Sequence, residues 1–116
     1  MSFDGILATL LDVPGALGAA FIDPQGQTVA QLGAPEATEI LGAYQSVWLG
    51  ELGRVAERAG LGAVSDLSLD FDGKRVLSAQ VKSGYFLLVV FDRTGLSSIA
   101  RSRLDDVRRN LAAEVG

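Results

Sequence analysis

The sequence contains no cysteine and no histidine among its 116 residues. Without cysteine the chain can form neither a disulfide framework nor a thiol nucleophile, which is compatible with a reducing cytoplasm. Without histidine it lacks a principal zinc ligand and the commonest acid–base group, so Ser–His and Cys–His nucleophile arrangements are impossible. We therefore expect a protein without catalytic residues, without a metal site and without a bound cofactor.

Long apolar runs and a positive net charge are also missing. No stretch approaches the roughly 20 apolar residues that a membrane-spanning helix needs, and the first residues, MSFDG, lack the features of a secretory signal. The net charge is −4, which argues against general affinity for nucleic acid or anionic lipid. These absences predict a cytoplasmic protein that binds neither nucleic acid nor membrane.

Apolar residues are abundant, at 48% of the chain, which is enough for the core of a single domain spanning residues 1–116. The strongest pattern is YFLLVVF at residues 85–91, bounded by Gly84 and Asp92. A short continuous apolar run is typical of a strand that is buried on both faces. We therefore place this strand at the centre of a sheet with helices on both sides.

Periodicity and turn residues divide the rest of the chain. Apolar residues at helical spacing predict helices at residues 3–11 and 35–59 and a last helix opened by Thr94-Gly95, with Thr94 as N-cap. Hairpin turns are predicted at Asp23-Pro24-Gln25-Gly26 and Asp72-Gly73. The strands between these signals cover residues 16–23, 27–32, 64–72, 74–82 and 85–91.

The resulting order is α-β-β-α-β-β-β-α. One hairpin and one meander of three strands imply a five-stranded antiparallel sheet, so the fold class is α/β of the α+β type with helices on both faces. The strand at residues 64–72 alternates between apolar and polar positions, and its hairpin register places Asp70 opposite Arg75. Outward charge is typical of an edge strand. A cation site on its aspartates is disfavoured, because Asp66, Asp70 and Asp72 are separated and lack a binding loop.

The long helix at residues 35–59 carries more apolar surface than one sheet needs. Its apolar positions span an arc of about 200° at 100° per residue, whereas a surface helix needs a stripe of about 100°. The excess face has no obvious partner within the chain, which indicates a protein interface. Leu49 and Leu52 are favoured for it, Trp48 is divided between interface and core, and Tyr44 is assigned to the core.

Two other patterns are given structural roles. The glycines at 18, 26 and 84 belong to turns and close packing, since no G-x-x-x-x-G-K-[ST] phosphate loop exists. The arginines of the last helix are interleaved with Asp105 and Asp106, so a solvated face is favoured over an arginine finger. These arginines are Arg101, Arg103, Arg108 and Arg109.

Two stretches carry a resemblance to a known family. They are VPGALGAAFID at residues 13–23, which leads into QGQ, and GYFLLVVFDRTGL at residues 84–96, which leads into the last helix. Together with the order of elements they resemble the Roadblock/LC7 family, in particular its stand-alone prokaryotic members. The resemblance implies a Roadblock/profilin-like fold. It also implies a homo- or heterodimer in which edge strands join into one sheet and the long helices lie side by side.

The resemblance further implies a non-enzymatic regulator or scaffold that binds a small Ras-like (MglA-like) GTPase through the long helix. Any GTPase-activating effect would then need no catalytic residue of this chain. Arg54 and Arg58 are the implied GTPase contacts. The residues assigned to the dimer or partner interface are Leu41, Gln45, Trp48, Leu49, Leu52, Val55, Ala56, Asp66, Ser68 and Asp70.

Two alternatives remain at this point. A small-molecule sensor of the PAS or GAF kind also has a five-stranded antiparallel sheet, but it needs an apolar cavity with convergent polar groups. The apolar positions that face the sheet leave no evident room for one. A purely structural dimerisation subunit would need only a second Roadblock-like chain.

Overall fold

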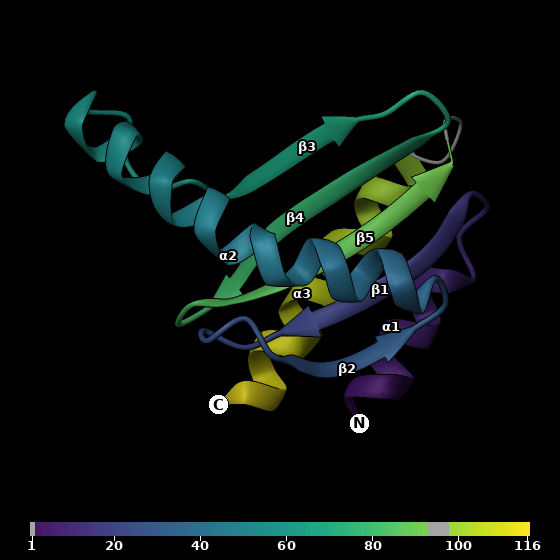
Figure 1. Cartoon of the computed structure of the whole chain (residues 1–116). Helices are drawn as coiled ribbons and strands as arrows, with labels where there is room; N and C mark the ends of the chain where they lie inside the picture. Colours follow the sequence, from purple (N-terminus) through teal and green to yellow (C-terminus); the bar gives the residue numbers. More distant parts are fainter. Residues whose placement is uncertain (1, 93–97) are drawn as a thin grey trace.

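The computed structural model describes residues 2–92 and 98–116, and Figure 1 shows the arrangement. The order of elements is the predicted one. The helices are α1 (Phe3–Leu11), α2 (Pro35–Arg58) and α3 (Ser98–Val115). The strands are β1 (Ala16–Ile22), β2 (Thr28–Leu32), β3 (Asp66–Asp70), β4 (Lys74–Lys82) and β5 (Tyr85–Asp92). The N-cap predicted at Thr94 lies outside the described residues.

All five strands join one antiparallel sheet in the order β2-β1-β5-β4-β3. The predicted fold class is thereby confirmed, as is the central place of β5, whose residues 86–91 are all buried. β3 is an edge strand, and Asp70 pairs with Arg75 as expected. β3 is shorter than the predicted 64–72, because its ladder with β4 extends only from Asp66 to Asp70.

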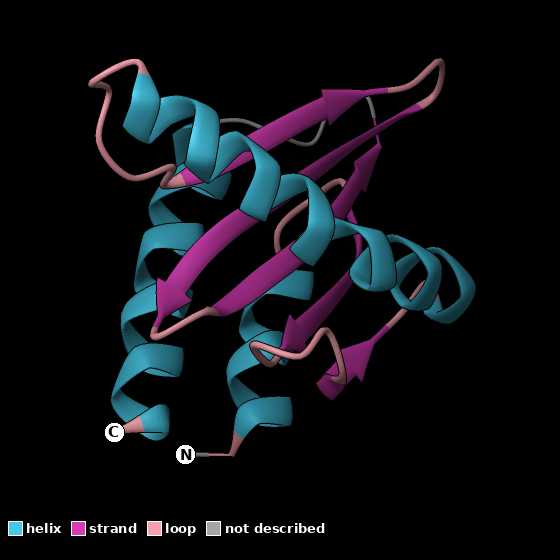
Figure 2. Ribbon diagram, turned by 60° about the vertical axis from the view of Figure 1, so that its left-hand side comes forward, coloured by secondary structure: helices cyan, strands magenta, loops and turns pink. Residues whose placement is uncertain are grey.

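Helices cover both faces of the sheet (Figure 2). α1 and α3 pack on one face, where Phe21, Leu87 and Phe91 of the sheet form the larger core with apolar side chains of both helices. α2 packs on the other face, where Leu49 meets a smaller core that includes Ile22 and Leu88. Successive side chains along each strand point to opposite faces of the sheet, so they contribute alternately to the two cores.

Local signals explain where the first elements begin and turn. Ser2 caps α1, because its Oγ accepts a hydrogen bond from the Gly5 N–H at 3.0 Å. The predicted turn after β1 forms around Asp23, whose carbonyl accepts from the Gly26 N–H at 3.0 Å. Gly26 has a φ of 85°, a conformation that glycine adopts without strain.

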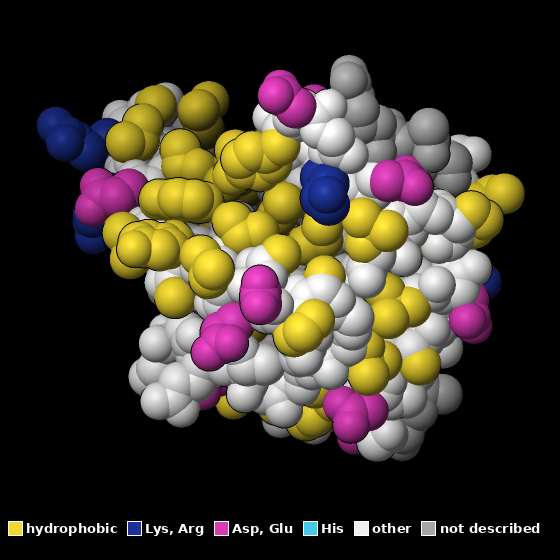
Figure 3. Space-filling view, turned by 45° about the vertical axis from the view of Figure 1, so that its right-hand side comes forward, with side chains coloured by type: hydrophobic (Ala, Val, Ile, Leu, Met, Phe, Trp, Pro, Cys, Tyr) yellow, Lys and Arg dark blue, Asp and Glu magenta, His cyan; other side chains and the backbone are white. Residues whose placement is uncertain are grey.

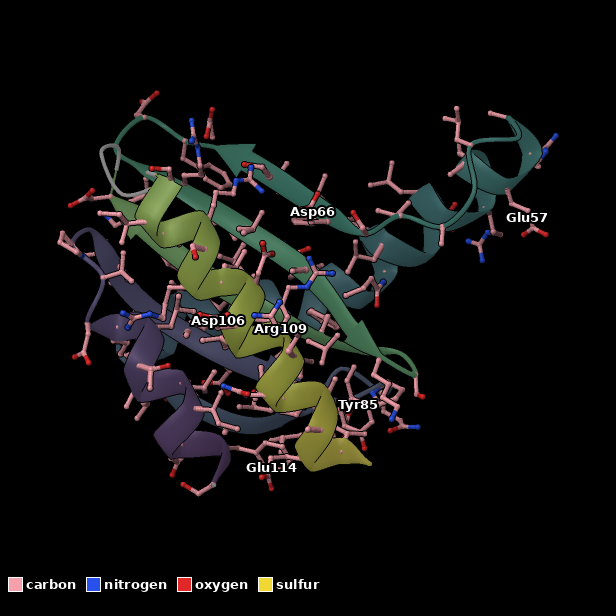
Figure 4. The ribbon with its side chains drawn as sticks, turned by 180° about the vertical axis from the view of Figure 1, so that it is seen from behind. Glu57, Asp66, Tyr85, Asp106, Arg109 and Glu114 are labelled. Carbon is pink, nitrogen blue, oxygen red and sulfur yellow. The ribbon has the colours of Figure 1, made fainter. Side chains whose placement is uncertain are left out.

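Close backbone approaches set the position of α2 over β1. A Cβ added to Gly18 would lie 2.7 Å from the Cβ of Ala34, at the start of α2. Within α2, a Cβ added to Gly42 would lie 3.0 Å from Cδ1 of Ile22. The helix then continues past the edge of the sheet, so that its last turns, including Glu57, extend beyond the strands (Figures 1 and 4). Within residues 2–92 and 98–116, no helix has the length and apolarity to cross a membrane.

Candidate protein-interaction surface

α2 exposes a wide apolar face. The helix packs on β1, β2 and β5, and the side chains of Thr38, Gln45 and Leu49 point into that contact and are buried. Six large apolar side chains of α2 are left 38–60% exposed. We call them the apolar α2 face: Ile40, Tyr44, Val47, Trp48, Leu52 and Val55.

The α2 residues that the sequence assigned to an interface fall into three groups. Trp48, Leu52 and Val55 lie on the apolar α2 face. Leu41 and Ala56 are half-buried at its border, with Leu41 packed against the smaller core. Gln45 and Leu49 are instead buried inside the single chain, so their side chains are not available to a partner in this structure.

Tyr44, in contrast, was expected in the core and is exposed. It was assigned to the core, but it is 57% exposed, and its ring stacks on that of Trp48 with centroids 6.1 Å apart. The helix seats its Gln45 side on the sheet, and Tyr44, one residue earlier, therefore points about 100° away. The assignment of Tyr44 to the core was wrong because the wide apolar arc allowed more than one seating.

The apolar α2 face continues onto β3. Leu67 and Leu69 pair with Ser78 and Val76, which lie on the α2 side of the sheet, and both leucines are half-buried. An open groove of about 520 Å³ lies between α2 and β3. Its lining is mainly apolar and comprises Trp48, Glu51, Leu52, Leu67, Leu69, Asp70 and Phe71. Figure 3 shows apolar side chains gathered over this part of the molecule.

Leu67, Leu69 and Phe71 are surface residues that the sequence reasoning did not assign to an interface. The signal was present, because the strand alternates and these three positions share one face. The structure shows that α2 leaves this corner of the sheet partly uncovered, since the helix packs mainly on β1, β2 and β5.

The other face of β3 carries ion pairs. Asp66, Ser68 and Asp70 lie there and are exposed. Nε of Arg75 donates to Oδ1 of Asp70 at 2.5 Å, and its Nη2 donates to Oδ2 at 3.2 Å. This hydrogen bonding, with the attraction of the carboxylate, raises the pKa of Arg75 above its ordinary value. Arg101 of α3 lies 3.7 Å from Oδ2 of Asp66.

Most of the other arginines in the described residues bond within the chain. Arg54 pairs with Glu51 on the exposed side of α2, and Arg58 is exposed in its last turn. On α3, Arg103 donates to the Thr9 carbonyl at 2.6 Å, and Arg108 donates to the Gln80 carbonyl at 2.6 Å and 3.0 Å. These two arginines therefore bind α3 to α1 and β4, a role that the expected solvated face does not include.

Buried polar atoms without partners occur in the layer between α2 and the sheet. Three buried side-chain atoms have no hydrogen-bond partner among the described residues: Nε2 and Oε1 of Gln45 and Oγ of Ser78. Ser78 pairs with Leu67 and Leu88, so it faces the same layer as Gln45. Such groups cost free energy when they are left unpaired. No three acidic side chains in the described part of the chain gather closely enough to hold a metal ion.

Comparisons with known proteins agree on one family. The family model of the Roadblock/LC7 domain matches residues 3–91. Myxococcus xanthus MglB is 17% identical, with a TM-score of 0.88 over 97% of this chain and 94% of that one. A Roadblock/LC7 domain from Streptomyces avermitilis is 16% identical, with a TM-score of 0.87 over 97% and 96%.

A further solved structure, an MglB with a tetrameric arrangement, is 18% identical, with a TM-score of 0.84 over 96% of this chain and 85% of that one. A search of curated proteins finds no matching sequence. At these identities the solved structures show that the fold is shared. The family model covers most of the sequence, and the predicted family is thereby confirmed. The chain belongs to the Roadblock/LC7 family.

Proposed function

We propose that this protein is a homodimeric regulator or scaffold that binds a small Ras-like GTPase. The observation that carries the proposal is the apolar α2 face together with the adjoining groove at β3. A contiguous apolar surface of this kind is uncommon on a monomer and typically marks a site of protein association. Membership of the Roadblock/LC7 family supports dimer formation and GTPase binding as the two uses of such a surface.

The two uses occupy neighbouring parts of one surface. In the proposed dimer, β3 meets its two-fold mate, and the groove beside it is covered by the second copy. The outer side of α2, away from the groove, then forms the platform for the GTPase, with the exposed Tyr44 as an aromatic anchor of the type that carries much binding energy. Arg54 and Arg58 lie on the exposed end of α2, where they would meet a GTPase surface.

The proposed regulator acts without catalytic residues of its own. Any acceleration of GTP hydrolysis would come from ordering of the GTPase's own residues, in the way that contacts order switch segments. We further propose that residues 1–116 act as one domain and that the protein works in the cytoplasm.

Capture of the GTPase tests this proposal. The purified protein, immobilised, is exposed to lysate of its source containing either a non-hydrolysable GTP analogue or GDP, and retained GTPases are identified by mass spectrometry. We expect one Ras-like GTPase to be retained preferentially in the GTP-like state. Leu52→Asp should reduce this retention at least about tenfold, because it places a charge in the groove that the second copy covers and so removes the dimer that presents the platform.

Ile99→Asp is the matched control, because Ile99 is another exposed large apolar residue and lies on α3. It should leave GTPase retention unchanged. Retention that ignores the nucleotide, or an equal loss in both variants, would contradict the proposed role. Recovery of a second Roadblock-like chain in place of a GTPase would favour a structural dimerisation subunit.

A further inference from the structure

The sequence of edge strand β3 reads the same in both directions. Its five residues are DLSLD, centred on Ser68. Two copies of an edge strand that meet across a two-fold axis run antiparallel, and each residue then lies opposite its palindromic equivalent. We propose that a second copy of this chain pairs with β3 about an axis at Ser68, and that Arg75 and Arg101 permit the pairing by neutralising the aspartates that it brings together.

This inference deepens the dimer proposed above and rests on it. It adds the register of the strand pair and the residues that control its strength. Neither follows from the family pattern, because both depend on the particular side chains of this β3 and its neighbours.

The backbone of β3 presents the groups that such a pairing needs. The two residues that flank β3 bond to β4: the Ser65 carbonyl accepts from the Gln80 N–H, and the Phe71 N–H donates to the Lys74 carbonyl, each at 2.8 Å. Along an antiparallel strand, successive residues direct their backbone groups alternately to one side and to the other. The N–H and C=O groups that face the open edge are therefore those of Asp66, Ser68 and Asp70.

A centre at Ser68 is the register that uses all of these groups. It places Ser68 opposite its own copy and Asp66 opposite Asp70 of the second copy, so that β3 overlaps its mate along its full length. A centre at Leu67 or at Leu69 would leave part of β3 without a strand opposite it. An edge strand that is also apolar on one face favours the complete overlap.

The apolar side of β3 supports the same occupant. In this register Leu67 lies opposite Leu69 of the second copy, and both face the α2 side of the sheet. The groove lined by Trp48, Leu52 and Phe71 adjoins these leucines. The second copy therefore brings its own groove against the first, and the apolar surface becomes continuous across the axis.

On the polar side of β3, pairing brings aspartates of the two copies together, and Arg75 and Arg101 offset their repulsion. Like charges directly opposite each other on a sheet are destabilising, and this register sets Asp66 opposite Asp70 of the second copy. Each carboxylate already has an arginine within its own chain: Arg101 at 3.7 Å from Asp66, and Arg75 at 2.5 Å from Asp70. Each pair of aspartates is then flanked by two positive charges, one from Arg75 and one from Arg101.

Cysteine cross-linking tests the register. The chain has no cysteine, so Ser68→Cys introduces a single thiol. Residues in a hydrogen-bonded antiparallel pair have Cα atoms about 5.5 Å apart, within the roughly 4.4–6.8 Å range of disulfides. We expect Ser68→Cys to form a disulfide-linked dimer under mild oxidation, detected by non-reducing electrophoresis, with Leu67→Cys and Leu69→Cys at least about tenfold slower, because their thiols lie off the axis.

Charge variants test the role of the arginines. In the double variant Arg75→Gln, Arg101→Gln, the dimer dissociation constant measured by sedimentation equilibrium at low salt should rise about tenfold, because two pairs of aspartates face each other without the positive charges of these two arginines. Raising the salt to about 1 M shortens the Debye length to about 3 Å, which should restore much of the affinity. Adding Asp66→Asn and Asp70→Asn should also restore it.

Arg109→Gln is the matched control. Arg109 pairs with Asp106 on the exposed side of α3 (Figure 4), so its loss removes an arginine ion pair without touching β3. Its dissociation constant should equal that of the wild type, and far-UV circular dichroism confirms that each variant is folded.

The outcomes separate this inference from the proposed function. A wild type that stays monomeric at every concentration overturns both. A stable dimer in which Leu67→Cys or Leu69→Cys cross-links as fast as Ser68→Cys overturns the register alone. An unchanged dissociation constant in the double arginine variant overturns the role of Arg75 and Arg101 and leaves the dimer standing.

Discussion

Gln45 places an amide in an apolar layer, where neither of its polar atoms has a hydrogen-bond partner among the described residues. Gln45→Leu removes both atoms while keeping a side chain of similar size. We expect the free energy of unfolding to rise by about 1 kcal/mol, because an unsatisfied buried amide is replaced by a group that needs no partner. Urea unfolding followed by circular dichroism measures the change.

Gln27→Leu is the matched control, since Gln27 is exposed and its side chain should contribute little. Its free energy of unfolding should stay within about 0.5 kcal/mol of the wild type. A clear loss of stability in Gln45→Leu would contradict the prediction, because it would mean that the amide is hydrogen-bonded in solution.

The same residue marks the limit of what the sequence predicts at this scale. Periodicity finds which α2 positions share a face, but an apolar arc of about 200° can be seated on the sheet in more than one way. The structure seats α2 on Gln45 and Leu49 and exposes Tyr44 and Trp48. The aromatic Tyr44 is exposed and the polar Gln45 is buried, which is the opposite of what hydrophobicity alone would predict.

Among the elements, α2 contains glycines that its packing does not require. A Cβ added to Gly50 would meet nothing within 4 Å, and glycine inside a helix is about 1 kcal/mol less favourable than alanine. Gly50→Ala should therefore raise the free energy of unfolding by roughly 0.5–1 kcal/mol, measured by urea unfolding.

Gly42→Ala provides the comparison within the same helix. The added Cβ would lie 3.0 Å from Cδ1 of Ile22, so the gain in helix propensity should be offset by crowding against β1. If Gly42→Ala stabilised the protein as much as Gly50→Ala, the close contact between α2 and β1 would not constrain the helix.

Helices and strands with strong local signals were predicted well, whereas the part of the sheet that α2 covers was not. The apolar run of β5, the two hairpin turns and the pairing of Asp70 with Arg75 all follow from patterns of a few neighbouring residues. How far α2 reaches across the sheet depends on the close approaches at Gly18 and Gly42, which bring together residues distant in sequence. For this reason the alternation of β3 alone could not show whether its apolar face is covered or exposed.

At the scale of the whole molecule, the exposed apolar surface should make stability depend on concentration. If a second copy covers the groove beside β3, dimerisation stabilises the folded state by mass action, and Tm rises with protein concentration. Trp48, at the edge of the groove, is the single tryptophan and reports directly on burial. We expect its fluorescence emission to shift to the blue, and Tm to rise by several degrees, over a hundredfold increase in concentration.

Leu52→Asp should remove both effects, because a carboxylate in the groove would be buried without a partner in the dimer. Its Tm should be independent of concentration, and its Trp48 emission should stay at the position of the dilute wild type. Ile99→Asp, on the other face, should behave as the wild type does. If Tm and Trp48 emission of the wild type did not change with concentration, the prediction that a second copy covers the groove would be contradicted. The apolar α2 face and the groove would then be available to a different protein.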